Sequence, residues 1–106
     1  MEYDVELLRE LMFSLEERQL SPRTTVVLSL REEAVEFGRT PAQVEASLDS
    51  LLELAYIDGG GHDEEPGYWL FRKLTRKGTQ FVQATRKPRD WERMKRHFET
   101  QRVASR

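Results

Sequence analysis

The sequence predicts an α+β fold that is mainly helical, with a small antiparallel sheet. Three observations within residues 40–78 lead to this prediction. A capped apolar helix begins at Thr40, a glycine-rich hairpin follows around Gly59–Gly61, and another capped helix begins at Thr75. Helix, hairpin and helix follow one another in this order in a winged helix-turn-helix, so we expect that fold, with an extra C-terminal helix beyond the hairpin.

Residues 4–19 predict the first helix. Asp4 is a suitable N-cap, and the apolar residues recur at helical spacing, which gives the helix one buried face. These apolar residues are Val5, Leu7, Leu8, Leu11, Met12 and Leu15. Pro22 follows the helix and prevents it from continuing.

Residues 24–37 allow two interpretations. The β-branched run from Thr24 to Val27 and the alternating pattern that follows it favour extended structure, a strand pair that turns near residues 31–33. Alternatively, residues 31–37 form a short helix, the first of the helix-turn-helix, with Gly38 in its turn. The sequence favours the extended interpretation slightly.

The remaining elements are predicted from caps and breakers. Thr40 and Pro41 begin a helix that extends to Ala55, with a buried stripe of Leu48, Leu51 and Leu52. The glycine run at residues 59–61 turns the chain back, and residues 68–71 return as a strand.

Thr75 then caps a helix with Phe81 and Val82 facing inward. Pro88 ends this helix, and a last helix begins at Arg89 or Asp90, with Trp91, Met94 and Phe98 on one face. We therefore expect a single winged-helix domain over residues 1–100 and a frayed tail over residues 101–106.

Composition restricts the class of protein. The chain has 106 residues, of which 38% are hydrophobic and 34% charged, which fits one small domain with a thin core. It contains no cysteine, so disulfides and thiolate metal sites are excluded. The sequence shows no signal peptide and no apolar stretch long enough to span a bilayer, so we expect a cytoplasmic protein with no membrane partner.

Opposite charges collect in the two parts of the chain. Residues 1–71 contain 16 acidic and five basic residues, whereas residues 72–106 contain three acidic and 12 basic residues. This separation indicates a charged partner, or else pairing between the two ends of the chain itself. The two explanations are about equally favoured.

Two sequence blocks resemble a known family. The first is the opening helix, residues 3–11, and the second is Leu74-Thr75-x-x-Gly78-x-x-Phe81 followed by Arg86 and Trp91. They are similar to a family of small winged-helix proteins of bacteriophages and prophages, known mainly as a domain of unknown function. The resemblance implies a fold and a phage or mobile-element origin, but no activity.

The expected function is recognition, and we weigh two kinds of partner. Double-stranded DNA would be bound by the basic C-terminal part, where lysines and arginines contact phosphates. The residues predicted to bind nucleic acid are Arg72, Lys73, Arg76, Lys77, Arg86, Lys87, Arg89 and Arg93, with Lys95 and Arg96 beside them and Gln80 and Gln83 as supplements.

The alternative partner is a basic host protein that is bound by the acidic surface of this chain. The residues predicted for that surface are Glu45, Asp49, Glu53, Asp63, Glu64 and Glu65. Several of these acids lie on the helix before the hairpin, which reads DNA in ordinary winged helices, so reading by that helix is disfavoured.

No enzyme activity, cofactor or metal site is predicted. No serine has a histidine near it in sequence, and the acidic run after His62 is better explained as a solvated turn than as a metal site. The apolar residues around Trp91 also allow a homodimer.

Overall fold

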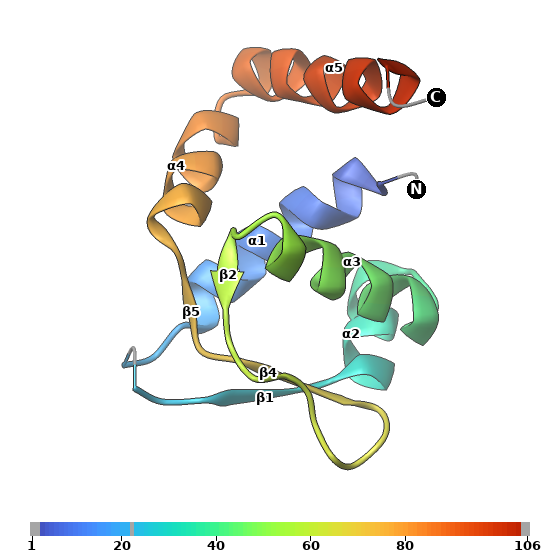
Figure 1. Ribbon diagram of the computed structural model, residues 1–106, viewed down its shortest axis with the longest axis vertical. Coiled ribbons are helices and arrows are strands. Elements are labelled where there is room, and N and C mark those ends of the chain that lie inside the picture. The colour runs from blue at the N-terminus through green and yellow to red at the C-terminus, as the bar shows by residue number, and fades with distance from the viewer. Residues whose placement is uncertain (1–2, 22, 105–106) are drawn as a thin grey trace.

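The computed structural model describes residues 3–21 and 23–104, and their side chains as far as residue 97. These residues form an α+β fold that is mainly helical, as the sequence predicts. In chain order the elements are α1 (Val5–Arg18), β1 (Val26–Ser29), α2 (Leu30–Phe37), α3 (Pro41–Glu53), β2 (Ile57–Asp58), β3 (Gly61–His62), β4 (Tyr68–Phe71), β5 (Lys73–Leu74), α4 (Arg76–Thr85) and α5 (Pro88–Ala104). Helix α5 lies at one end of the molecule, and strands β1 and β4 lie at the other (Figure 1).

The strands form two antiparallel sheets. The larger has the order β1–β4–β3, and its register pairs Leu28 of β1 with Trp69 of β4. The smaller sheet joins β2 to β5 and pairs Ile57 with Leu74. Because β2 closely follows α3 and β5 directly precedes α4, the smaller sheet brings the end of α3 close to the start of α4.

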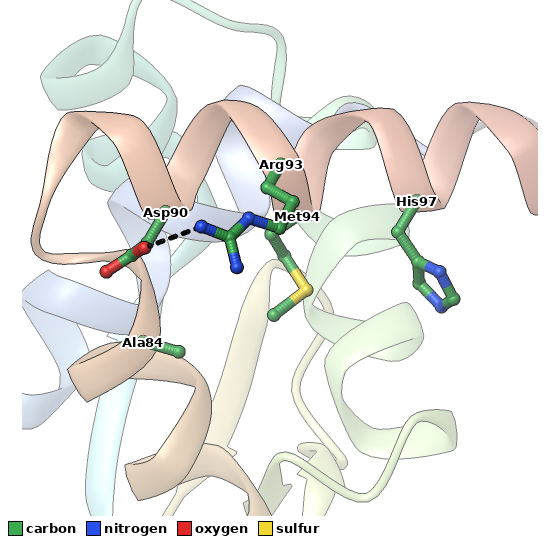
Figure 2. A pocket seen from close by; sticks show the side chains of 5 residues that line it. All are labelled: Ala84, Asp90, Arg93, Met94 and His97. Carbon is green, nitrogen blue, oxygen red and sulfur yellow. Dashed lines mark ion pairs between the residues drawn. The ribbon is translucent and has the colours of Figure 1, made fainter.

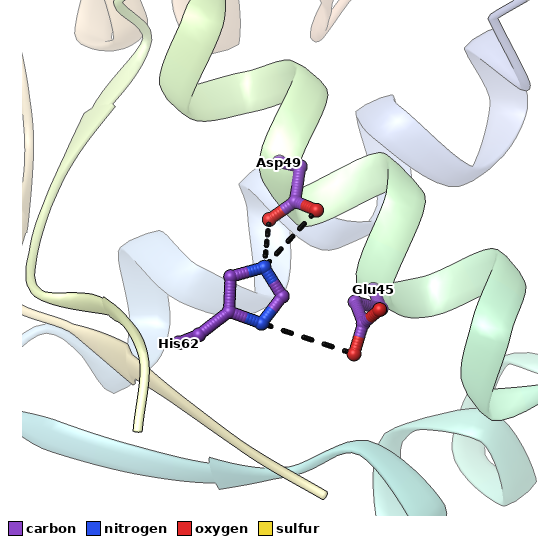
Figure 3. Close-up of side chains that lie close together, drawn as sticks. All are labelled: Glu45, Asp49 and His62. Atoms are coloured by element: carbon purple, nitrogen blue, oxygen red, sulfur yellow. Dashed lines mark hydrogen bonds and ion pairs between the residues drawn. The ribbon is translucent and has the colours of Figure 1, made fainter. Parts of the chain in front are cut away.

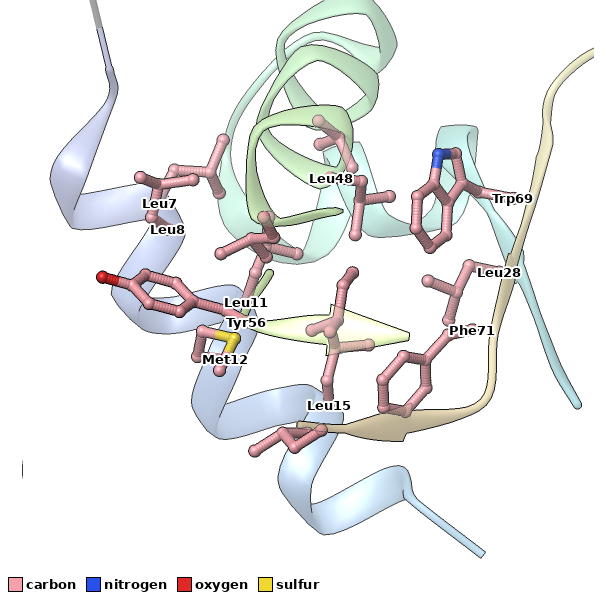
Figure 4. Close-up of a cluster of buried hydrophobic side chains, with 14 of the residues drawn as sticks. Leu7, Leu8, Leu11, Met12, Leu15, Leu28, Leu48, Tyr56, Trp69 and Phe71 are labelled. Carbon is pink, nitrogen blue, oxygen red and sulfur yellow. The ribbon is translucent and has the colours of Figure 1, made fainter. Parts of the chain in front are cut away.

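One hydrophobic core lies between α1, α3 and the inner face of the larger sheet (Figure 4). Helix α1 contributes its predicted apolar face, and β4 contributes Trp69 and Phe71, both fully buried. Burying a large apolar side chain completely stabilises a fold by about 1.5–3 kcal/mol. The most deeply buried residues of α1 are Leu7, Leu8, Leu11, Met12 and Leu15.

Three predicted helix caps are confirmed. Asp4 accepts a hydrogen bond from Leu7 N, and Thr75 accepts one from Gly78 N. Thr40 forms a reciprocal capping box with Gln43, in which each side chain bonds to the backbone N–H of the other. These caps explain why α1, α3 and α4 begin where the sequence predicts.

The extended interpretation of residues 31–37 is wrong. Only residues 26–29 form a strand, and the chain then enters the eight-residue helix α2. Ser29 caps this helix by accepting a hydrogen bond from Glu32 N, and Gly38 ends it in the left-handed conformation. Val35, a β-branched residue of the alternating pattern, is 81% exposed, so its side chain makes no packing contact that would stabilise a strand.

The hairpin turns later than predicted. The glycine run does not reverse the chain but connects β2 to β3, and residues 63–67 form the turn between β3 and β4. Gly59 is required for close approach, because a Cβ atom there would lie 2.5 Å from the carbonyl oxygen of Leu70. Glycine is therefore needed at residue 59, where β4 passes close to the segment between β2 and β3. The turn of the hairpin is formed by residues 63–67 instead.

Helix α3 presents a different face from the predicted one. Leu48 and Leu51 are fully buried, but Leu52 is 38% exposed. Ser47 and Ser50, which lie outside the predicted stripe, are both buried, and Ser50 donates to the carbonyl oxygen of Ala46. The buried stripe therefore includes the two serines and excludes Leu52, since α1 packs against that side.

Helix α5 begins at Pro88, one residue before the predicted start, because proline is well suited to the first turn of a helix. Trp91 is buried and Met94 packs partly against the core. The side chain of Phe98, predicted on the same face, lies outside the described residues. The helix continues to Ala104, beyond the point near Thr100 where fraying was expected, and residues 105–106 are outside the described range.

Candidate nucleic-acid interface

Helix α4 separates an apolar side from a polar side. Phe81, Val82 and Thr85 are buried, as is Gly78, where the helix crosses close to Tyr56. The opposite side is exposed, and we call the four residues that follow it the α4 row: Arg76, Gln80, Gln83 and Lys87. Spacings of four, three and four residues place these side chains on one face, with Lys87 just beyond the helix end. Helix α4 contains no acidic residue.

Three of the eight residues predicted to bind nucleic acid are held in ion pairs. Arg72 lies 2.6 Å from Asp58, and Arg93 lies 3.5 Å from Asp90. Arg86 lies 2.5 Å from Glu16 of α1. The hydrogen bond from Arg72 holds the pKa of Asp58 below its ordinary value. These three arginines are therefore partly neutralised.

The other five of these residues form no ion pair with any described residue. We call them the free cations: Lys73, Arg76, Lys77, Lys87 and Arg89. Lys73 lies in β5, and Arg76 and Lys77 lie in the first turn of α4. Lys87 lies just beyond the end of α4, and Arg89 lies in the first turn of α5. The structure thus leaves basic side chains available at both ends of α4.

Lys77 is positioned by an aromatic ring. Its ammonium nitrogen lies 5.2 Å from the centre of the Tyr56 ring, within the range of a cation–π contact. Tyr56 stacks in turn on Phe81 of α4, with ring centres 4.8 Å apart. Burial raises the pKa of Tyr56, so this ring stays neutral at physiological pH. The charge of Lys77 remains at the surface.

The two oppositely charged parts of the chain neutralise each other in part. Besides the pair between Arg86 and Glu16, Lys95 of α5 lies 3.2 Å from Glu6 of α1. Hydrogen bonds to Glu92 and Glu6 raise the pKa of Lys95 above its ordinary value. The sequence left open whether the basic residues pair within the chain, and the structure shows that Arg72, Arg86 and Lys95 pair with carboxylates of residues 1–71.

An open hollow of about 490 Å³ lies between α4 and α5 (Figure 2). Ala84 and Met94 provide its apolar lining, and Asp90, Arg93 and His97 stand around it. Arg93 and Asp90, which form an ion pair, both line this hollow.

The predicted acidic surface lies on α3 and the hairpin. Glu53, Glu64 and Glu65 are exposed, and Asp63 is partly exposed. Asp49 is instead held in place, because its Oδ1 accepts a hydrogen bond of 3.1 Å from the indole N–H of Trp69. The acidic residues thus divide into a free group, at the end of α3 and in the hairpin, and an engaged group within α3.

His62 joins this engaged group, a contact that the sequence analysis missed. Its Nε2 lies 2.9 Å from Asp49 Oδ1, and its Nδ1 lies 3.9 Å from Glu45 Oε2 (Figure 3). The sequence linked His62 only to the acids that follow it in the turn. The contact depends on the fold of the hairpin onto α3, so no local spacing indicates it.

Within the described part of the chain, no helix has the length and apolar character needed to cross a membrane. No curated protein and no solved structure matches the chain. A family model described as hypothetical protein (DUF2513) matches residues 2–104. Because this match covers nearly the whole sequence, the protein belongs to that family of hypothetical proteins.

Proposed function

We propose that this protein binds double-stranded DNA through the α4 row and the free cations around it. The observation that supports this proposal best is the composition of the row, in which two basic residues and two glutamines are exposed with no carboxylate on the same helix. Lysine and arginine supply most of the affinity for phosphates, and glutamine can hydrogen-bond base edges. The other helices of the described residues that carry basic residues, α1, α2 and α5, each carry acidic residues as well.

A winged helix-turn-helix arrangement is part of the proposal. The order α1, β1, α2, α3, β3, β4 and the sheet order β1–β4–β3 support it, with β3 and β4 as the wing. In ordinary winged helices the helix that precedes the wing enters the major groove. Here that helix is α3, which has three acids and no basic residue, so it would be repelled by phosphates. We therefore place the DNA against α4.

Salt dependence tests the proposal. Fluorescence anisotropy with a labelled duplex, measured from 50 to 200 mM salt, should give a log–log slope of up to about −4.5 if all five free cations contact phosphates. Arg76→Gln and Lys87→Gln should each make the slope less negative by about 1. Both side chains are exposed and unpaired among the described residues, so neither change should disturb the fold.

Arg31→Gln is the matched control. Arg31 is also exposed and forms no ion pair with a described residue, but it lies on α2, away from α4 (Figure 1). This variant should bind with the slope of the wild type. Charge reversal at Arg76, Lys77 and Arg89 together should abolish binding. If the two row variants keep the wild-type slope, or if the wild type does not bind DNA at 50 mM salt, the α4 row is not a DNA site.

A basic host protein remains the alternative partner that we propose. It is favoured by the exposure of Glu53, Glu64 and Glu65, which form no ion pair with any described residue. Changing these three residues to glutamine should leave DNA binding unweakened. The acidic surface is the functional one if this triple variant no longer captures a nuclease-treated basic protein that the wild type captures. In that case the variants of the α4 row should capture the basic protein as the wild type does. The phage origin, the homodimer and the cytoplasmic location stay predictions of the sequence.

A further inference from the structure

We propose that Glu45, Asp49 and His62 bind a divalent transition-metal cation, with Zn²⁺ as the representative ion. The three residues come from two elements, α3 and β3, and one ligand atom from each lies within 4.8 Å of the others. In Figure 3 the imidazole ring of His62 lies between the two carboxylates, with Nε2 toward Asp49 and Nδ1 toward Glu45. An ion bound at Nε2 therefore requires the half-exposed Glu45 side chain to turn toward Asp49. This site is separate from the α4 row and does not depend on the proposed DNA binding.

The fold brings these ligands together by register. His62 of β3 is paired with Trp69 of β4, and directly paired residues direct their side chains to the same face of a sheet. The buried Trp69 side chain reaches Asp49 through its indole N–H, and the imidazole of His62 reaches Asp49 from the neighbouring strand. Glu45 and Asp49 are four residues apart on α3, so they share one face of that helix.

Trp69 acts as an outer partner of the proposed site. Carboxylates that ligate metals are usually held by a further hydrogen bond, which fixes their orientation. Here the donor is a fully buried indole, whose position is set by the core. The Asp49 carboxylate is therefore oriented before any cation binds, and the exposed His62 and the half-exposed Glu45 can adjust around it.

The donor set indicates the class of cation. One imidazole and two carboxylates favour Zn²⁺ and related transition metals, whereas Mg²⁺ and Ca²⁺ favour oxygen ligands alone. Two ligand atoms on a tetrahedral zinc lie about 3.3 Å apart, given bonds of about 2.0 Å. The present separation of 2.9 Å between His62 Nε2 and Asp49 Oδ1 is close to this value. Water would complete the coordination, since the site is open to solvent.

Isothermal titration of the full chain with Zn²⁺ tests the site. The wild type should bind one equivalent, and His62→Gln should lose at least tenfold in affinity. The matched control is His97→Gln, because the chain contains two histidines and no cysteine. His97 lies on α5, far from β3 in the fold, and its variant should bind zinc as the wild type does.

Tryptophan fluorescence gives a second readout that is local to the site. In a Trp91→Phe background Trp69 is the only indole, so Zn²⁺ should change its emission through Asp49. Adding His62→Gln should remove this change, whereas Mg²⁺ at the same concentration should not produce it. The proposal is overturned if the wild type binds no zinc, if His62→Gln binds as tightly as the wild type, or if His97→Gln is the variant that loses binding. In each of these cases His62 serves only to connect β3 to α3 through its contacts with Asp49 and Glu45.

Discussion

Arg9 of α1 donates two hydrogen bonds to the carbonyl oxygen of Thr85, from Nε at 3.2 Å and from Nη2 at 3.0 Å. Thr85 is the last residue of α4, where helix carbonyls have no partner within the helix. The same guanidinium group lies over the rings of Phe13 and Trp91, 4.7 and 5.2 Å from their centres. One side chain therefore connects α1, the end of α4 and the start of α5.

Replacing Arg9 should destabilise the fold. A hydrogen bond to a charged group contributes about 1.5–3 kcal/mol, and Arg9→Ala would lose this contribution together with the ring contacts. Arg9→Lys should recover less than half of the loss, because an ammonium group has neither the planar fork nor the stacking surface of a guanidinium. Urea unfolding measures both variants. Equal stability of Arg9→Lys and the wild type would show that only the charge matters.

Gly78→Ala should be more damaging than a typical alanine substitution. A Cβ atom at position 78 would lie 1.9 Å from the carbonyl oxygen of Tyr56, which is backbone and cannot rotate away. Overpacking of this kind costs about 1–3 kcal/mol or more, so we expect a loss at the upper end of that range in thermal or urea unfolding.

Gly38→Asn is the control for this substitution. Gly38 has a φ of +64°, and a Cβ atom at this position would meet no other atom within 4 Å. Asparagine also tolerates the left-handed conformation. The loss of stability should therefore stay below about 1 kcal/mol. If both variants lose the same stability, backbone conformation rather than the close contact between α4 and Tyr56 explains the effect.

The contribution of Asp4 to stability should depend on pH. Burial opposes ionisation of this carboxyl, but hydrogen bonds from Arg39 and Leu7 N outweigh it and hold the pKa of Asp4 below its ordinary value of 3.8. A lowered pKa in the folded state means that the carboxylate stabilises the fold above 3.8, and that this stabilisation is lost as the pH falls through the lower folded value.

The variant Asp4→Asn isolates this contribution. Asparagine is also a good helix cap, so the hydrogen bond to Leu7 N can persist while the ion pair with Arg39 is lost. Urea unfolding should show the wild type more stable than Asp4→Asn at pH 7, with a difference that shrinks below about pH 4. A difference that stays constant from pH 7 to pH 3 would contradict the pairing.

Gln80 and Gln83 should affect DNA specificity without affecting the salt dependence. This prediction rests on the proposed function. After selection of a preferred duplex with the wild type, Gln80→Ala and Gln83→Ala should each lower its preference over a scrambled duplex by about tenfold, because a good base contact discriminates by about 1–3 kcal/mol. The salt slope should not change, since neither residue carries charge. If the salt slope changes while the preference for the selected duplex does not, both glutamines contact only the DNA backbone.

Local chemistry predicted most of the helical part of the fold. Asp4, Thr40 and Thr75 each supply a side-chain oxygen to the first turn of a helix, so these starts need no tertiary information. Helix α2 has local signals too, a cap at Ser29 and Gly38 at its end, but the β-branched run before it favoured extended structure. Eight residues are too few for a stable isolated helix, and α2 exists because Leu30 and Ala34 pack against the core.

The candidate sites also differ in whether local sequence or tertiary packing determines them. The exposure of Arg76 and Gln80 follows from helical spacing once α4 is placed, so the sequence could predict the α4 row. The pair between Arg86 and Glu16 joins residues 70 positions apart, and His62 meets Asp49 only through the register of β3 with β4. Contacts of this kind depend on tertiary packing and leave no local pattern.

The connection made by Arg9 has an evolutionary consequence. Its guanidinium bonds the carbonyl oxygen at the end of α4 and lies over the ring of Trp91, so each of these two side chains helps to position the other. Across the family these two positions should therefore change together, and members that lack the arginine should also lack the aromatic residue at the start of α5.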